Sequence, residues 1–186
     1  DDKVYKNNEK GKARKLASVR SFFKYLFNHD MIYRNVVSKV PTPKLHSKEI
    51  IRLESDEVER MLDAVQMPTT FTERQKNYNK NTKVRDNAIV TLFLGTGIRV
   101  SELVGLNVED IDFSQNAFKV TRKGGNQVIL YYPNEVKYAL QEWLEIRKTL
   151  PIDENEKALF ISLQNRRICT RAVENLVKKF ARESTP

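Results

Sequence analysis

One arginine, placed between two segments that should form helices, has the clearest potential for phosphate chemistry in this chain. Residues 95–103 have the sequence Gly-Thr-Gly-Ile-Arg-Val-Ser-Glu-Leu and follow an almost wholly apolar run, Asn87 to Leu94. The two glycines predict a sharp turn after a buried helix. Arg99 then falls at the start of the next helix. There, free backbone N–H groups favour an anion and a guanidinium can grip two phosphate oxygens.

The same residues permit a simpler interpretation. Glu102 lies three residues after Arg99, on the same helical face, so the two side chains can form an ordinary ion pair. Helix starts that carry an arginine are common, and a glycine pair is weak evidence for a phosphate site. Physical reasoning alone therefore favours the ion pair.

The segment at 95–103 resembles the box that carries the first catalytic arginine of the tyrosine recombinases, the phage integrase and Xer-like family. Further segments agree with that family in order and spacing, so that the resemblance covers nearly the whole chain: Leu16–Ile32, Leu53–Leu62, Asn107–Asp112, Lys123–Gly125 and Arg167–Phe180. It implies a mainly α-helical fold with a small antiparallel β-sheet. A partial, SAM-like helical core-binding domain would precede the N-terminal half of the catalytic domain.

The resemblance also implies roles for individual side chains. In the family a hairpin lysine is the second catalytic group, and this position is Lys123 here. It would protonate the departing 5′ oxygen of DNA, whereas Arg99 would stabilise charge on the non-bridging phosphate oxygens. Glu102 would orient Arg99. Without the resemblance, Lys123 beside two glycines would be interpreted as an ordinary solvated turn. The reaction that the resemblance implies uses no metal ion, cofactor or ATP.

The chain departs from the family in ways that bear on activity. The family reaction also needs a His-x-x-Arg box, a later His or Trp, and a tyrosine that forms a covalent 3′-phosphotyrosine. Both histidines, His29 and His46, precede Arg99, and the tyrosines at 131, 132 and 138 lie in or just after a hairpin strand. We assign no nucleophile. We expect the chain, like the middle of a recombinase, to bind DNA without cleaving it.

The charge distribution supports nucleic acid as a partner. The net charge is +9, and it is uneven: residues 1–50 hold 12 Lys and Arg against 5 Asp and Glu, and residues 163–186 hold 6 against 2. Basic ends of this kind are typical of a surface that binds duplex DNA. The residues that we expect to contact DNA are Arg14, Lys15, Arg20, Lys24, Arg166, Arg167 and Arg171.

Other features of composition indicate a cytoplasmic protein. A single cysteine, Cys169, excludes an internal disulfide and a cysteine cluster for a metal. No apolar run approaches the roughly 20 residues that a membrane span requires, and no leader-like segment opens the chain.

The hydrophobic pattern predicts two domains. In residues 1–40, the C-terminal part of the core-binding domain, we expect a helix from about Ala13 to Asn28 with a core-facing aromatic stripe, and a short helix from Ile32 to Val40. Two prolines then predict a linker over residues 41–52. Residues 53–186 should form a partial catalytic domain without the His-x-x-Arg box and the nucleophilic tyrosine.

Within the second domain, Ser55 is the expected N-cap of the first helix, and the polar residues 67–82 are expected to form a loop. Residues 118–121 and 128–131 predict a β-hairpin. A helix with Trp143 in the core should follow, and Thr170 is the expected cap of a last helix.

Three functions remain open at this stage. The resemblance favours a site-specific recombinase that acts on double-stranded DNA as a multimer, a tetramer on paired sites. A non-catalytic DNA-binding module is the second possibility. A type IB topoisomerase relative is the third, but the Arg-x-Ser-Glu-Leu string and the basic first helix argue against it.

Overall fold

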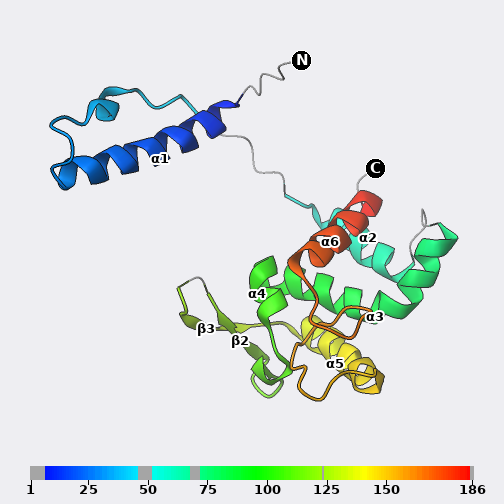
Figure 1. The fold of residues 1–186 in the computed structure, drawn as a ribbon. Coiled ribbons are helices and arrows are strands. Elements are labelled where there is room, and N and C mark those ends of the chain that lie inside the picture. Colours follow the sequence, from blue (N-terminus) through cyan, green and yellow to red (C-terminus); the bar gives the residue numbers. More distant parts are fainter. Residues whose placement is uncertain (1–6, 46–51, 68–71, 123, 185–186) are drawn as a thin grey trace. The chain divides into compact units, whose positions relative to one another are not determined.

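The computed structural model describes residues 7–45, 52–67, 72–122 and 124–184 (Figure 1). The chain divides into two compact units, Asp1–Arg52 and Leu53–Pro186, and each is described by itself. The fold is mainly helical with a small antiparallel sheet, which confirms the predicted fold class. Among the described residues, no helix is both long enough and apolar enough to cross a bilayer.

The first unit is built on one long helix, α1 (Glu9–Asn28), followed by the short 3₁₀ helix η1 (Val36–Lys39). α1 begins four residues earlier than expected because the side chain of Asn8 caps it, accepting a hydrogen bond from Gly11 N at 2.7 Å. The predicted helix from Ile32 to Val40 was too long, since only the four residues of η1 are helical.

Among the described residues of the first unit, the aromatic stripe of α1 is not buried. No residue of the helix is buried, and Phe22 is 59% exposed. The expectation of a core-facing stripe is therefore wrong for the described residues of this unit. An amphipathic sequence pattern shows which face is apolar but does not show that a partner covers it.

The larger unit combines helices with one small sheet that lies to one side of them (Figure 1). Its elements are α2 (Ser55–Gln66), α3 (Glu73–Thr96), α4 (Val100–Gly105), η2 (Val108–Asp110), β1 (Ile111–Asp112), β2 (Ala117–Thr121), β3 (Gln127–Tyr131), α5 (Asn134–Thr149) and α6 (Thr170–Ser184). α3 lies against both α2 and α5, and α6 packs on α2 and α4. The N-cap residue of α2 is Glu54, whose backbone N–H donates to Oε2 of Glu57 at 2.9 Å, so the expected cap, Ser55, is instead the first helical residue.

The sheet contains the predicted hairpin. Its strands run antiparallel in the order β1-β2-β3, and Lys119 pairs with Ile129. Side chains alternate along β2, so that Phe118 and Val120 are buried while Lys119 is exposed. The hairpin thereby has one face in the core and one face in solvent.

The core of the larger unit joins α3 and α5 closely. Trp143 of α5 is 3% exposed and donates from Nε1 to the carbonyl of Leu159 at 2.8 Å, which confirms its predicted place in the core. Near the end of α3, a Cβ atom at Gly95 would lie 2.6 Å from Cγ2 of Val136. A glycine is therefore required there for helix packing rather than for a turn.

The predicted loop over residues 67–82 is wrong from Glu73 onward, because α3 begins there. The first half of α3 is helical although it contains few apolar residues. The side chains that it buries are polar: Asn79 and Thr82 are 5% and 1% exposed, and Asn79 Nδ2 donates to the carbonyl of Val65 at 3.4 Å. Apolar periodicity cannot detect a helix face that is buried through hydrogen bonds.

Candidate active site

The turn that carries Arg99 is set by the end of α3. Gly97 has φ +63°, a left-handed conformation that favours glycine, and its N–H donates to the carbonyl of Phe93 at 2.9 Å. Ile98 follows and is buried. The chain thus turns immediately before Arg99, but of the two glycines that predicted the turn only Gly97 forms it, since Gly95 lies within α3.

Arg99 is the N-cap residue of α4, and its guanidinium faces solvent. The side chain is 71% exposed, and Nη1 donates to Oε1 of Glu102 at 2.9 Å. The backbone N–H of Arg99 donates to the other carboxylate oxygen at 3.1 Å. One buried carboxylate therefore holds both the backbone and the side chain of an exposed arginine. Because α4 has only six residues, the guanidinium rather than the helix dipole is the main source of positive potential.

Glu102 is ionised in this arrangement. Burial raises its pKa, but hydrogen bonds and charge interactions with Arg99, together with the charge of Arg122, outweigh burial and leave the pKa below its ordinary value of 4.5. The ion pair expected from the spacing is therefore present. A buried anion beneath an exposed cation also fits the orienting role implied for Glu102.

The turn end of the β2–β3 hairpin reaches the same carboxylate. Arg122 Nε lies 4.0 Å from Oε1 of Glu102, and the Arg122 side chain is 44% exposed. The turn is closed by Arg122 N–H donating to the carbonyl of Asn126 at 2.8 Å, and Gly124 and Gly125 both have positive φ. Lys123 itself lies outside the described residues.

Arg122 was not singled out from the sequence. The only available signal is its place directly before Lys123, and lysine–arginine neighbours are common in basic chains. Its relation to Glu102 depends on the register of the hairpin against α4, which no local pattern encodes.

The structure separates the expected DNA contacts into two groups. Those with exposed side chains are Arg14, Lys15, Lys24, Arg166 and Arg171. Arg20 and Arg167 instead bind other parts of their own units. Arg20 donates to Oγ1 of Thr42 at 2.7 Å and to the carbonyl of Val40, so the start of the predicted linker is tied to α1.

Arg167 has a structural position. Its Nη1 donates to the carbonyls of Val104 and Leu106, at 2.7 and 3.0 Å, and its Nη2 donates to Oδ1 of Asn107 at 2.6 Å. The side chain closes the end of α4, where backbone carbonyls lack helical partners. A guanidinium held in this way has few donors left for phosphate.

Of the tyrosines after Arg99, Tyr131 and Tyr138 are exposed, whereas Tyr132 is buried. The Tyr132 hydroxyl donates to the carbonyl of Asp112 at 3.2 Å, and its ring stacks on Phe118. Burial, with a smaller contribution from the Asp112 charge, raises the pKa of Tyr132 to about 12. Tyr132 is therefore a core residue and a poor nucleophile.

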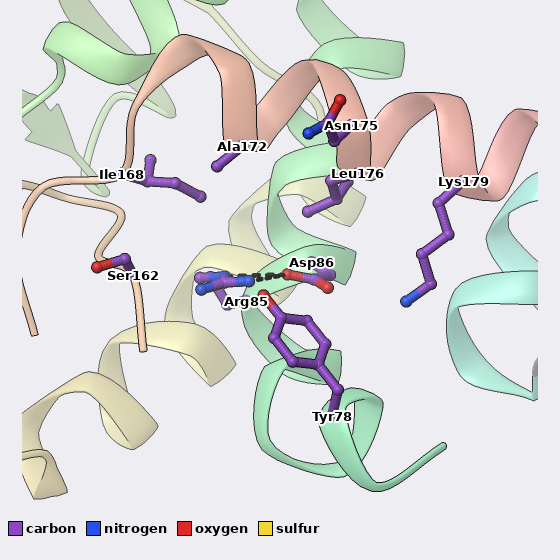
Figure 2. A pocket seen from close by; sticks show the side chains of 9 residues that line it. All are labelled: Tyr78, Arg85, Asp86, Ser162, Ile168, Ala172, Asn175, Leu176 and Lys179. Carbon is purple, nitrogen blue, oxygen red and sulfur yellow. Dashed lines mark hydrogen bonds and ion pairs between the residues drawn. The ribbon is translucent and has the colours of Figure 1, made fainter. Parts of the chain in front are cut away.

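A buried ion pair lies elsewhere in the unit, beside a hollow of about 290 Å³ (Figure 2). Arg85 donates from Nε and Nη2 to Oδ1 of Asp86, at 2.9 and 2.6 Å, and Thr82 donates to Oδ2 at 2.9 Å. Arg85 Nη1 also donates to the carbonyl of Ile161 at 2.9 Å. The arginine thus joins α3 to the segment before α6, which gives the pair a structural role.

An open hollow of about 540 Å³ adjoins Arg99. Its lining is mostly apolar and includes Leu53, Met61, Phe93 and Val177, from α2, α3, α6 and the segment before α2. Within the described part of the chain, no group of three His, Cys, Asp or Glu side chains is placed to hold a metal ion.

Comparison with known sequences finds the phage integrase family. The model of that family matches residues 51–185. The tyrosine recombinase XerC of Thermodesulfovibrio yellowstonii is 36% identical over 174 residues, 91% of this chain and 54% of that protein. XerC of Caldanaerobacter subterraneus subsp. tengcongensis is 34% identical, over 93% of this chain and 45% of that protein. The chain thus spans about half the length of these relatives.

Solved structures share the same fold. XerH site-specific recombinase bound to its difH substrate superposes with a TM-score of 0.68 at 15% identity, over 95% of this chain and 49% of that chain. A lambda integrase tetramer bound to a Holliday junction gives 0.66 at 16% identity, over 92% and 46%.

Proposed function

The chain belongs to the phage integrase family, and from this premise we propose that the complete protein breaks and rejoins DNA strands at specific sites through a 3′-phosphotyrosine. One observation carries the proposal. Arg99 presents an exposed guanidinium that a buried, ionised carboxylate fixes in place from beneath. Such a fixed donor can stabilise the negative charge that builds on a phosphodiester during cleavage.

The proposed division of labour follows from side-chain chemistry. Arg99 binds the non-bridging oxygens of the scissile phosphate, and Lys123 gives a proton to the departing 5′ oxygen. Glu102 orients Arg99 and does not touch the DNA. The 186 residues contain neither a His-x-x-Arg box nor a tyrosine in a suitable place, so we assign no nucleophile within them. The reaction as proposed needs no metal ion or cofactor.

We propose that double-stranded DNA is held through the exposed basic side chains of both units: Arg14, Lys15, Lys24, Arg166 and Arg171. Arg20 and Arg167 are left out of this surface because their guanidinium groups are bound within the protein. The lambda integrase structure is of a tetramer on a Holliday junction, and by analogy the complete protein would act as a multimer on paired sites.

The test uses a suicide DNA substrate, from which the cut strand diffuses away so that the covalent intermediate accumulates. The complete protein should give a covalent protein–DNA adduct on a tyrosine outside residues 1–186. The 186-residue chain alone should give none. An adduct on Tyr131 or Tyr138 of the short chain would contradict the proposed assignment, and no adduct from the complete protein would favour a non-catalytic DNA-binding module.

A further inference from the structure

Two arginines from different elements meet at one carboxylate oxygen. Oε1 of Glu102 lies 2.9 Å from Nη1 of Arg99, at the start of α4, and 4.0 Å from Nε of Arg122, directly after β2. Because both nitrogens are this close to one oxygen atom, they are near enough to each other to bind oxygens of a single phosphate group.

The charges of this cluster do not cancel. Glu102 supplies one negative charge, whereas Arg99 and Arg122 supply two positive charges. The carboxylate is buried, with a side chain 6% exposed, while the two guanidinium groups are 71% and 44% exposed. The surplus positive charge therefore faces solvent, where a phosphodiester with its single negative charge would complete the balance.

The two contacts with Glu102 differ in kind. The Arg99 contact is a charge-assisted hydrogen bond, but 4.0 Å is too long for a hydrogen bond from Arg122 Nε. Arg122 is thus attracted to the carboxylate without giving up its Nε–H to it. That donor remains free of Glu102 and can turn to an incoming anion.

We propose that Arg122 is a second phosphate-binding residue. Glu102 holds Arg122 near Arg99, and the two guanidinium groups together bind the DNA backbone. The proposal rests on the proposed function, because it takes DNA as the source of the phosphate. It adds a cation that neither the sequence motif nor the family resemblance supplied, at the position between β2 and Lys123.

The test measures the salt dependence of duplex DNA binding by the 186-residue chain. Each phosphate contact releases counterions and adds about 0.9 to the slope of log affinity against log salt. Arg122→Gln should lower the magnitude of that slope by about one, and Arg122→Lys should keep it. If Arg122 only supported the fold, Arg122→Gln would weaken binding at every salt concentration and leave the slope unchanged, which would overturn the proposal.

Arg60→Gln is the matched control. The Arg60 side chain has the same 44% exposure, but it has its own counter-charge, since Nη2 lies 2.8 Å from Oδ2 of Asp56. Its slope should equal that of the unchanged chain. If log affinity of the unchanged chain did not depend on log salt, DNA binding itself would be overturned. A steep slope that Arg122→Gln does not alter would overturn only the role of Arg122.

A second measurement uses the unchanged chain, so its result does not depend on whether a variant folds. The Nε–H signals of Arg99 and Arg122 can be followed by NMR while the unchanged chain is titrated with inorganic phosphate. Both signals should move with one dissociation constant. Movement of the Arg99 signal alone would assign phosphate to that residue and contradict a role for Arg122.

Discussion

Arg99 depends on one buried carboxylate for its orientation, and this dependence can be measured through pH. Since the pKa of Glu102 lies below its ordinary value of 4.5, its ionised form stabilises the folded state. That contribution is fully present above about pH 4.5 and is lost as the pH falls through the lowered pKa.

Glu102→Gln should lower the free energy of unfolding by about 1.5–3 kcal/mol at pH 7, as expected when hydrogen bonds to a charged group are lost. The difference between the variant and the unchanged chain should shrink as the pH is lowered below 4.5. Urea unfolding of both proteins at several pH values measures this. A difference that stays constant down to pH 3 would contradict the ionised state assigned to Glu102.

At the same scale, Arg99 and Lys123 should fail in different ways when they are removed from the complete protein. Arg99→Ala should lower the rate of DNA cleavage by about a hundredfold or more, as for the loss of an oxyanion donor. A substrate with sulfur in place of the bridging 5′ oxygen should restore most of the rate to Lys123→Ala, because a thiolate leaves without a proton.

The same sulfur substrate should not rescue Arg99→Ala, which serves as the control for the Lys123 variant. Equal rescue of both variants, or rescue of neither, would show that Lys123 is a turn residue and that the general acid lies elsewhere.

Among the elements, the close contact of α3 with α5 positions the turn before Arg99. A Cβ atom at Gly95 would lie 2.6 Å from Val136 Cγ2 and 3.4 Å from Pro133 Cδ, so Gly95→Ala must push the helices apart. The cost should be about 1–3 kcal/mol of unfolding free energy, typical of an overpacked core.

Gly105→Ala is the control for this contact. Gly105 ends α4, and a Cβ atom there would meet nothing within 4 Å. Thermal unfolding should show this variant to be as stable as the unchanged chain or slightly more stable, because alanine restricts the unfolded chain. Equal melting temperatures for the Gly95 and Gly105 variants would refute the close approach.

Elements with a clear apolar pattern or turn chemistry could be predicted from the sequence. The hairpin followed from two β-like runs on either side of two glycines, and the place of Trp143 in the core followed from helical spacing. The first half of α3 could not be predicted in this way. Its inward residues, Asn79 and Thr82, are polar. Asn79 donates to the carbonyl of Val65, fourteen residues earlier, and Thr82 donates to Asp86, one helical turn later.

The candidate site was predictable only in part, for the same reason. Residues near Arg99 in sequence, such as Glu102, follow from helical spacing. Arg122 contacts Glu102 across a gap of twenty residues, and Arg167 binds carbonyls about sixty residues earlier. Both placements depend on how the elements pack, which sequence patterns do not specify. A basic residue therefore cannot be assigned to DNA from its charge alone.

For the larger unit as a whole, the buried Arg85–Asp86 pair matters most for stability when only one of its two partners is removed. The two side chains are 5% and 2% exposed, and Arg85 also reaches the carbonyl of Ile161. Arg85→Ala would remove the cation that is hydrogen-bonded to the buried Asp86 carboxylate. The expected cost is about 3–5 kcal/mol of unfolding free energy.

The double variant Arg85→Met with Asp86→Leu should recover much of that loss, because apolar residues of similar volume need no buried partner. Denaturant unfolding of the single and double variants compares the two. A double variant less stable than Arg85→Ala alone would mean that the pair is itself a net source of stability.

The three hydrogen bonds of Arg167 have a consequence for the order in which the larger unit forms. They join residues 60 to 63 positions apart, so the entropy of closing that loop must be met before they form. We expect the hairpin and α5, which are local, to assemble before Arg167 reaches the end of α4. Arg167→Ala should then leave the refolding rate nearly unchanged and speed unfolding, since its contacts are absent from the folding transition state. The lifetime of the folded unit, rather than the speed at which it is reached, would depend on this arginine.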